Sequence, residues 1–303
     1  MPDLKSSRLT INKHTLIWGK RTYVMGILNI TPDSFSGDGF IKTTRSNYTE
    51  FINQAVEQGR SFVEAGADIL DIGGESTRPG SQPVSAEEEI ERVIPVVQSL
   101  ASELDVLISI DTYKSQVAEA ALSAGADIVN DVWSLHADPE LASTAARHNA
   151  VVILMHNRSK PSNAQIQEHL GGRYVGMEYN NLLEDVCREL IESVQIAKAA
   201  GIPDDHIILD PGIGFGKTVE QNLELMDRLA EIRAVGYPVL LGPSRKSFIG
   251  YTLNLPLDQR LEGTAAAVAV GITRGADIMR VHDVEYMIRV VRMTDAIVRR
   301  ETG

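Results

Sequence analysis

The sequence predicts an α/β protein built on a (β/α)8, or TIM, barrel with a short N-terminal strand or hairpin in front of it. Two observations support this fold class. Eight apolar segments of strand length alternate with segments of helical period, which is the element order of a parallel barrel. A short motif ending in Gly-Ala-Asp-Ile also recurs at 65–69, 124–128 and 274–278, each time between a predicted helix and a predicted strand.

The recurring motif indicates which end of the barrel it occupies. Its glycine ends the helix, and its aspartate marks the start of the next strand, on the face of a barrel that serves stability. We therefore interpret Asp68, Asp127 and Asp277 as structural. The alternative fold is an open, doubly wound sheet. That fold would need a glycine-rich phosphate turn of Rossmann spacing after the first strand, and residues 26–40 do not show one.

The elements are predicted in chain order, with residues 1–22 as an N-terminal extension (strand or hairpin) and 23–303 as the barrel domain. The first barrel strand stops at Pro32, because proline cannot continue a central strand. The helix at 48–65 ends at Gly66, and Ser85 with Glu88 forms a capping box that opens the helix 85–103. The other predicted strands are 9–18, 68–73, 106–111, 128–131, 151–155, 207–210, 239–242 and 278–281. The other predicted helices are 115–124, 139–149, 180–200, 218–235, 259–274 and 283–300, with a long polar connection at 157–179.

The composition limits the class of protein. The 303 residues are 43% hydrophobic and 23% charged, which is ordinary for a soluble globular chain. No apolar run is long enough for a membrane span, and residues 1–21 lack the apolar core of a secretory signal. The single cysteine, Cys187, excludes an internal disulfide, so we expect a cytoplasmic protein. A formal charge of −12 argues against nucleic-acid binding, but it allows a local site for an anionic small substrate.

Polar side chains follow nearly every predicted strand. Because the carboxyl ends of barrel strands meet at one mouth, these side chains should face one another or a ligand. The reason is that a buried charge without a partner would strongly destabilise the fold. The strand-end residues that we select for chemistry are Asn29, Asp111, Asn130, Asp210, Lys246, Arg280 and His282.

Three of these residues, Asp111, Asn130 and Asp210, suit the base of a pocket for a flat heterocycle. A carboxylate meets two adjacent ring N–H donors with two hydrogen bonds. Structural alternatives remain open at this point: a turn cap for Asp210, a helix cap for Asp111 and a core hydrogen bond for Asn130. Asn29 has the alternative of capping its own strand.

The cations lie on the last two strands, where barrels place phosphate sites. Lys246 follows the seventh strand, and Arg280 and His282 share one face of the eighth. The alternatives are a salt bridge to inner carboxylates for Arg280 and a helix cap for His282. In the first two loops, Asp33 and Arg78 would be ordinary solvated residues on local pattern alone.

Several segments together resemble the dihydropteroate synthases, the folate-pathway enzymes that sulfonamides inhibit. The resemblance covers nearly all of 23–299. The matching segments are Gly26–Ser36, Asp71–Gly80, Ile110–Thr112, Asn130–Asp131, Leu154–His156, Asp210–Gly216, Ser244–Ser247 and Arg280–His282. Members of this family are barrel transferases that join 6-hydroxymethyl-7,8-dihydropterin pyrophosphate to p-aminobenzoate, with Mg2+ as cofactor, and release pyrophosphate.

The resemblance implies a role for each matched residue. It implies that the pterin is bound by Asp111, Asn130, Asp210 and Lys246, and that Asn29 helps to bind Mg2+. The diphosphate side is implied to involve Thr77, Arg280 and His282. The implied aminobenzoate pocket is lined by Pro79, Phe215, Ser244 and Lys246. Asp33 and Arg78 belong to loops that would close over the site, so the catalytic set is Asp33, Arg78, Lys246, Arg280 and His282.

Two other classes of function stay open on the sequence. One is a pterin-binding, corrinoid-dependent methyltransferase domain, and the other is a non-catalytic paralogue that binds a partner. The segments Thr77–Pro79 and Ser244–Lys246 argue against the first, and the intact polar set argues against the second. After Met155-His156 the chain departs from the family's usual turn and carries a long insertion. A homodimer through the last helices is implied by the resemblance only.

Overall fold

Eight parallel strands form the main sheet of the computed structural model, which describes residues 4–31, 45–76, 81–167, 169–175 and 177–300. Their bounds are β3 (Tyr23–Asn29), β4 (Ile69–Gly73), β5 (Leu107–Asp111), β6 (Ile128–Asp131), β7 (Val151–Met155), β10 (Ile207–Asp210), β11 (Leu240–Leu241) and β12 (Ile278–Val281). The strand order is β10-β7-β6-β5-β4-β3-β12-β11, and a parallel bridge between Leu209 and Val239 joins the two ends. The predicted barrel is confirmed, and the open sheet is wrong.

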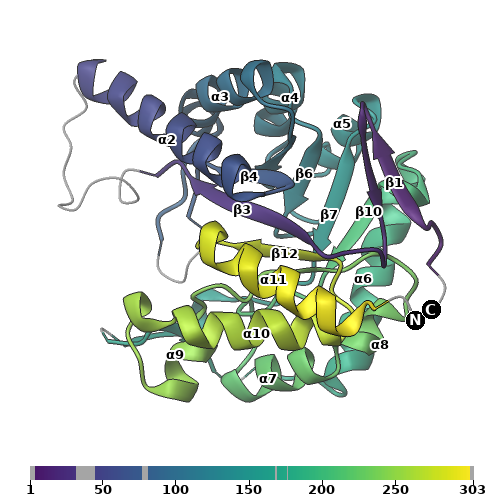
Figure 1. Cartoon of the computed structure of the whole chain (residues 1–303). Coiled ribbons are helices and arrows are strands. Elements are labelled where there is room, and N and C mark those ends of the chain that lie inside the picture. Colours follow the sequence, from purple (N-terminus) through teal and green to yellow (C-terminus); the bar gives the residue numbers. More distant parts are fainter. Residues whose placement is uncertain (1–3, 32–44, 77–80, 168, 176, 301–303) are drawn as a thin grey trace.

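A helical segment follows each strand of the barrel and covers its outer surface (Figure 1). The helices are α2 (Arg45–Ala65), α3 (Ala86–Glu103), α4 (Ser115–Ala124), α5 (Leu141–Arg147), α6 (Leu182–Ala199), α7 (Val219–Asp227), α8 (Leu229–Arg233), α9 (Ser247–Leu253), α10 (Leu261–Thr273) and α11 (Val284–Val298). Short 3-10 turns lie at η1 (Pro161–Asn163), η2 (Asp204–His206) and η3 (Leu257–Gln259).

The helix prediction was wrong in two places. The single helix predicted over 218–235 is broken at Arg228, which leaves the helical region with ψ near 20°. The guanidinium of Arg228 binds Glu224 before the break and Glu231 after it. Helix α9 was not predicted, because its seven residues are too few to show a clear helical period. At Ser85 the side chain accepts from the Glu88 amide at 3.2 Å, which is one half of the predicted capping box, while the Glu88 carboxylate pairs with Arg92.

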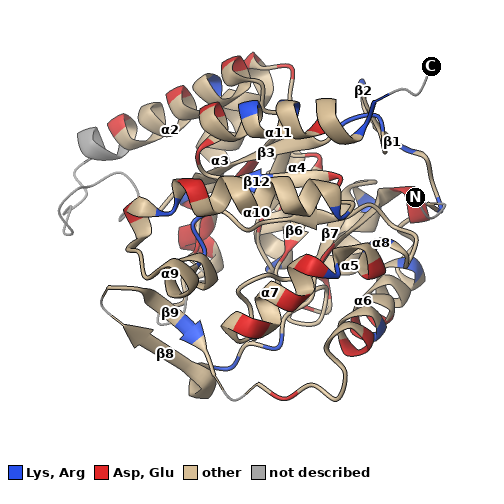
Figure 2. Cartoon of the chain, turned by 60° about the horizontal axis from the view of Figure 1, so that its bottom comes forward, with Lys and Arg blue, Asp and Glu red and all other residues tan. Residues whose placement is uncertain are grey.

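Two hairpins lie outside the barrel sheet. The predicted N-terminal hairpin is formed by β1 (Arg8–Ile11) and β2 (His14–Ile17), at the end of the barrel where the chain termini lie (Figure 1). Its side chains Leu9, Leu16 and Trp18 pack against the first residues of the barrel strands, so the hairpin closes that mouth. A second hairpin, β8 (Ala164–Gln167) with β9 (Gly171–Tyr174), occupies the connection predicted only as a polar insertion. Figure 2 shows it beside α9.

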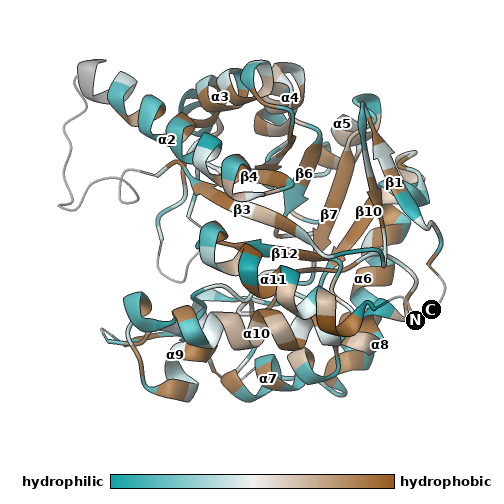
Figure 3. Ribbon diagram, in the orientation of Figure 1, coloured by the Kyte–Doolittle hydropathy of each residue, from teal (hydrophilic) through white to brown (hydrophobic). Residues whose placement is uncertain are grey.

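Strand parity decides what faces the inside of the barrel. Successive residues alternate between the two faces of a strand, so Ile69 and Asp71 share the inner face of β4, and Ile278 and Arg280 that of β12. The inward residues near the N-terminal ends of the strands are apolar and pack against the hairpin. Figure 3 shows that the strands are largely hydrophobic. The upper layer carries the polar side chains. The barrel therefore has an apolar N-terminal half and a polar C-terminal mouth.

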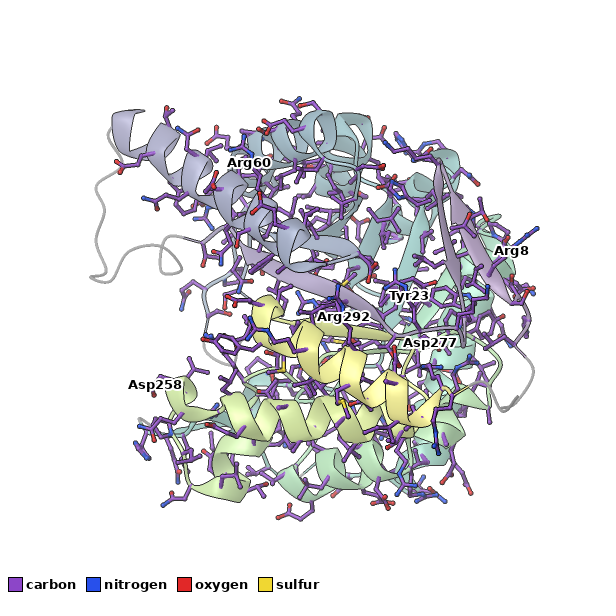
Figure 4. The ribbon with its side chains drawn as sticks, in the orientation of Figure 1. Arg8, Tyr23, Arg60, Asp258, Asp277 and Arg292 are labelled. Carbon is purple, nitrogen blue, oxygen red and sulfur yellow. The ribbon has the colours of Figure 1, made fainter. Side chains whose placement is uncertain are left out.

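The three motif aspartates lie at the N-terminal mouth and repeat one arrangement. Asp68, Asp127 and Asp277 each precede a strand and accept from the main-chain N–H of the neighbouring strand, all at 2.9 Å. The donors are the amides of Val24, Ile108 and Val239, and the carbonyl of each of these residues accepts from the backbone N–H of the same aspartate. Figure 4 shows Asp277 on the side of the barrel where Tyr23 and Arg8 lie. These aspartates therefore set the register of neighbouring strands.

Replacing Asp277 with alanine is expected to lower the free energy of unfolding by about 3–5 kcal/mol, because it removes one partner of a buried ion pair. Asp277 and Arg233 are both buried, with Nε and Oδ2 at 2.7 Å. Urea denaturation measures the change. The control is Asp227→Ala, since Asp227 is largely exposed in its pair with Arg274. A loss for Asp277→Ala no larger than that of the control would contradict the structural role.

Candidate active site at the C-terminal mouth

The C-terminal mouth gathers the polar residues of the upper layer from five strands. Asp71 and Asp111 come from β4 and β5, Asn130 from β6, Asp210 from β10 and Arg280 from β12. In the sheet, Asp111 is the register partner of Asn130, and Asn29 is the partner of Gly73. The selected residues Asp111, Asn130, Asp210 and Arg280 therefore share one end of the barrel, and Asp71, which was not selected, lies there with them.

Arg280 is the centre of this group. Its Nε lies 2.5 Å from Oδ2 of Asp71, and its Nη2 lies 2.5 Å from Oδ2 of Asp111. Asn130 donates from Nδ2 to the same Asp71 oxygen at 3.1 Å. The structure thus contains the salt bridge that was the alternative for Arg280. The two bonds use two of the five guanidinium N–H donors, so the side chain keeps donors for an anion.

Asp210 and Lys246 form the opposite wall with the loop after β10. Asp210 accepts from the Gly212 amide at 2.7 Å, so the turn cap that was the alternative for this residue is present. The Lys246 ammonium donates to the carbonyl of Ile213 and lies 4.4 Å from the centre of the Phe215 ring. Gly214 leaves room for that lysine, because a Cβ there would lie 2.9 Å from Cδ of Lys246. The wall therefore presents a cation, a carboxylate and an aromatic ring together.

Ser244 and His282 contact each other on the β11–β12 side. The Ser244 hydroxyl lies 3.0 Å from Nδ1 of His282 and accepts from the His282 amide at 3.2 Å. The N-cap residue of α11 is Asp283, so His282 does not hold the capping position that was its alternative. Likewise the N-cap of α4 is Lys114, so Asp111 does not cap that helix. Neither His282 nor Asp111 therefore has the helix-capping role that was its alternative.

Burial changes the acidity of the groups at the mouth. Burial raises the pKa of Asp111, although Arg280 opposes the shift. It also raises the pKa of Asp210, and here Lys246 is the main opposing charge. The pKa of Lys246 falls to about 8 because of burial, with Asp210 acting against the decrease. A ligand that supplies N–H donors to the carboxylates would favour their ionised forms.

Magnesium is the cofactor that the resemblance implies, and Asn29 is its predicted ligand at the end of β3. Across the described ranges, which omit 1–3, 32–44, 77–80, 168, 176 and 301–303, no group of three His, Cys, Asp or Glu side chains could hold a metal ion. Mg2+ usually takes one or two protein oxygens, with phosphates and water completing its shell. A single amide oxygen fits an ion that arrives with a diphosphate, and it does not fit a cage made by the protein alone.

Four predicted residues lie outside the part of the chain that the structure describes, namely Asp33, Thr77, Arg78 and Pro79. A cavity of about 680 Å3 lies against the loops that follow β6 and β7. Its lining includes Trp133, Asn157, Arg158 and Lys160, none of which is a predicted site residue. Arg280 and Lys246 occupy the centre of the mouth instead, each held by its protein partners.

Sequence reasoning missed two residues of this region, Asp71 and Lys217. Asp71 is fully buried and lies two residues after the inward Ile69, so strand parity was a signal that could have found it. Lys217 is 2% exposed and follows the glycine-rich segment after β10. No local pattern marks it, because a lysine after a glycine-rich loop is normally solvated.

Comparison with known proteins agrees with this geometry. A family profile described as pterin binding enzyme matches residues 25–282. A curated dihydropteroate synthase of Clostridium beijerinckii is 50% identical over 93% of this chain and 96% of its own length. The corresponding protein of Bacillus subtilis is 47% identical over 94% of this chain and 92% of its own. The chain belongs to the dihydropteroate synthase family.

Solved structures of this family have the same fold. A Yersinia pestis dihydropteroate synthase, described as a sulfonamide drug complex, has a TM-score of 0.84 and 39% identity, covering 96% of this chain and 98% of its own. A Xanthomonas albilineans dihydropteroate synthase, described with 4-aminobenzoic acid, has a TM-score of 0.84 and 37% identity, covering 97% of this chain and 98% of its own. The chain is accordingly a transferase. Neither the methyltransferase nor the silent paralogue is supported as an alternative.

Proposed function

We propose that this chain joins 6-hydroxymethyl-7,8-dihydropterin pyrophosphate to p-aminobenzoate, giving 7,8-dihydropteroate and pyrophosphate. The observation that carries the proposal is the position of Arg280, which contacts Asp71 and Asp111 and retains further donors. One side chain thus connects a carboxylate floor suited to a pterin with an anion site suited to its diphosphate. Family membership and the sulfonamide and 4-aminobenzoic acid complexes of relatives support the same substrates.

The pterin would bind on the carboxylate side of the mouth. Asp210 and Asp111 accept N–H donors from the aminopyrimidinone edge, and Asn130 adds a donor and an acceptor. Lys246, on the same wall as Asp210, would cover the ring, and Phe215 and the Ile213 carbonyl hold its ammonium. This arrangement orients the methylene carbon of the substrate toward the β12 side. It also favours positive charge on the ring as the bond to diphosphate breaks.

The reaction needs a leaving-group site more than a strong base. When the carbon–oxygen bond breaks, its electron pair leaves with pyrophosphate, and Arg280 and His282 stabilise the new anionic charge. The neutral amine of p-aminobenzoate then forms the carbon–nitrogen bond and loses a proton. Ser244 orients His282 through the 3.0 Å contact at Nδ1. When bound, Mg2+ supplies neutralising charge to the diphosphate, and Asn29 with the diphosphate oxygens would hold it.

The outer part of the site belongs to the first two loops. We assign Asp33 and Arg78 to closing over the substrates, Thr77 to the diphosphate and Pro79 to the aminobenzoate pocket, together with Phe215, Ser244 and Lys246. Closure would exclude water, which would otherwise capture the same cation.

We also propose a cytoplasmic location, consistent with the finding that no helix in the described part of the chain could cross a membrane.

A homodimer through the last helices is part of the proposal. The exposed surface of α11 carries Tyr286, Met293 and Ile297, which are 53%, 63% and 56% exposed. Their spacing of seven and four residues places them along one face of the helix, and Val270 of α10 is exposed as well. An apolar row of this kind is typical of a surface that another chain covers.

The exchange Met293→Glu is expected to convert the dimer into a monomer at micromolar concentration, because it buries a charge in an apolar contact. Light scattering coupled to size-exclusion chromatography measures the mass of each variant. The control is Ile166→Glu, since Ile166 on β8 is 65% exposed and far from α11 in sequence and element. A wild-type protein of monomer mass, or a dimeric Met293→Glu variant, would contradict this interface.

The test of the proposed function is product formation by the purified chain. The assay contains the pterin pyrophosphate, p-aminobenzoate and Mg2+, and it measures both dihydropteroate and released pyrophosphate. Equal amounts of the two products are expected. Pyrophosphate release without dihydropteroate would indicate hydrolysis, and absence of both products would refute the proposal.

A further inference from the structure

The buried ammonium group of Lys217 is unused by the chemistry described above. Its side chain lies between two loops of the mouth, the one after β7 and the one after β10, and the residue is only 2% exposed. A buried lysine is costly unless hydrogen bonds or opposite charge compensate it. Its neighbours therefore indicate what the group does.

Three acceptors surround the Lys217 nitrogen at ordinary hydrogen-bond distance. Nζ lies 2.9 Å from Nδ1 of His156, 3.0 Å from the Gly212 carbonyl and 3.0 Å from the Phe215 carbonyl, with the His156 carbonyl farther away at 3.4 Å. An ammonium group has three N–H donors, so it matches these three acceptors one to one. A neutral amine has only two N–H donors and would leave one carbonyl without its bond.

His156 is arranged to accept this bond. Its Nε2 lies 3.0 Å from a carboxylate oxygen of Glu189, so the ring proton is assigned to Nε2 and the Nδ1 lone pair faces Lys217. Burial, and next the charge of Lys217, lower the pKa of His156 to about 4, which keeps the ring neutral. Burial opposes ionisation of Glu189, but hydrogen bonds from His156 and Arg158 lower the pKa of its carboxyl.

Other charges face Lys217 from every neighbouring segment. Burial lowers the pKa of the Lys217 ammonium to about 7, and Lys246 and Arg158 add to the decrease, while Asp210 and Glu189 oppose it. The three-acceptor geometry favours the charged form within this balance. Lys217 therefore belongs to a small network that spans β7, α6 and the loop after β10.

The loop of residues 210–216, which Lys217 contacts, has a backbone conformation that requires glycine at three positions. Gly212, Gly214 and Gly216 all have positive φ, at 70°, 82° and 59°. A Cβ on Gly212 would lie 1.8 Å from the His156 carbonyl oxygen, and one on Gly216 would lie 2.4 Å from the Arg158 carbonyl carbon. The loop thus presses directly on the backbone after β7. Its carbonyls point two ways: those of Gly212 and Phe215 toward Lys217, and that of Ile213 toward Lys246.

We propose that Lys217 is a positioning residue whose ammonium group holds the 210–216 loop in the shape that presents Asp210 and Phe215 to the substrates. Without the ammonium, the inward carbonyls of Gly212 and Phe215 lose their donors, and the loop loses its attachment to His156. The Ile213 carbonyl and the Phe215 ring would then no longer hold Lys246. This inference rests on the proposed function, because Asp210, Phe215 and Lys246 are assigned there to substrate binding.

The test compares Lys217→Met with the wild type in the complete synthase reaction. Methionine has similar length and no donor. The KM values for the pterin pyrophosphate and for p-aminobenzoate are each expected to rise by about tenfold to a hundredfold, as for other residues that orient a binding group. The value of kcat should fall by a smaller factor than the KM values rise, because a rise in KM marks lost substrate binding. Arg280 and His282, which serve the leaving group, lie on the other wall.

Two further variants keep the result decisive. Lys217→Gln retains two N–H donors and is expected to give KM values between those of the wild type and Lys217→Met, even if the methionine variant folds poorly. Lys198→Met is the matched control, since Lys198 lies on the exposed end of α6 and pairs with Asp204. Its KM values should not change. Thermal unfolding of each variant separates a loss of stability from a loss of binding.

Three outcomes would overturn the inference: unchanged KM values in Lys217→Met, a fall in kcat alone, or a Lys217→Gln variant no better than methionine. A lower melting temperature with unchanged KM values would likewise show a purely structural lysine. Failure of the proposed function gives a different result, because the wild-type chain itself would then form no dihydropteroate.

Discussion

Arg280→Ala should slow turnover by about a hundredfold to a thousandfold, the usual effect of removing one donor that stabilises developing charge. Arg280 lies between the carboxylates of Asp71 and Asp111 and the proposed diphosphate site. The loss should appear mainly in kcat, since the charge on pyrophosphate is greatest as the carbon–oxygen bond breaks. Steady-state kinetics with saturating pterin pyrophosphate and p-aminobenzoate measures this change.

The same exchange also leaves the carboxylates of Asp71 and Asp111 without their cation, so stability must be measured beside activity. Arg280→Lys separates the two effects, because lysine keeps the charge but cannot form the forked contact of a guanidinium. It should retain more stability than Arg280→Ala and still lose much of kcat. The control Arg289→Ala removes an exposed arginine of α11 that pairs with Glu285. A kcat of Arg280→Ala equal to that of the control would refute the leaving-group role.

Asp210→Asn should weaken pterin binding by about tenfold to a hundredfold. A charge-assisted hydrogen bond contributes roughly 1.5–3 kcal/mol, and a tenfold change in affinity is about 1.4 kcal/mol. Asparagine can still accept the Gly212 amide bond of the turn, so the loop should keep its shape while the pterin edge loses its anionic partner. Calorimetry with 6-hydroxymethylpterin measures the affinity without requiring turnover.

The matched control for that experiment is Asp258→Asn. Asp258 is exposed and lies in η3, at the edge of the molecule (Figure 4), and the Asp258→Asn exchange should leave pterin affinity unchanged. Equal affinity of Asp210→Asn and the wild type would assign Asp210 to the turn alone. That result would leave the barrel intact and remove the main carboxylate from the proposed pterin site.

Local patterns were sufficient for most of the fold. The predicted bounds of α4, β6, β7, β10 and β12 agree with the structure residue for residue. Each of these elements has a regular apolar period and a clear stop, such as Gly125 in the left-handed region after α4. The predictions were less accurate where the stop signal was weak. At Arg228 no glycine or proline marks the break, and the inserted hairpin has short polar strands with little period.

The candidate site was only partly predictable. Asp111, Asn130, Asp210 and Arg280 are each the last residue of a strand or the last but one, and a parallel barrel brings such positions to one mouth. Asp71 lies in the middle of β4, and Lys217 lies beyond the loop after β10. Neither residue is therefore at a strand end, where the candidates were selected. The roles of Asp33, Thr77, Arg78 and Pro79 rest on resemblance, and these residues lie outside the described part of the chain.

The sequence by itself determined the order of the elements, the polar mouth and the family, because period, capping and short motifs act between residues that are near one another in the chain. Only the tertiary structure decided which charges meet. Arg280 reaches Asp71 across 209 residues of sequence and Asp111 across 169, and Lys217 reaches His156 across 61. Such pairs exist because closure of the barrel brings distant strand ends within hydrogen-bond distance, and burial then makes each partner indispensable to the other.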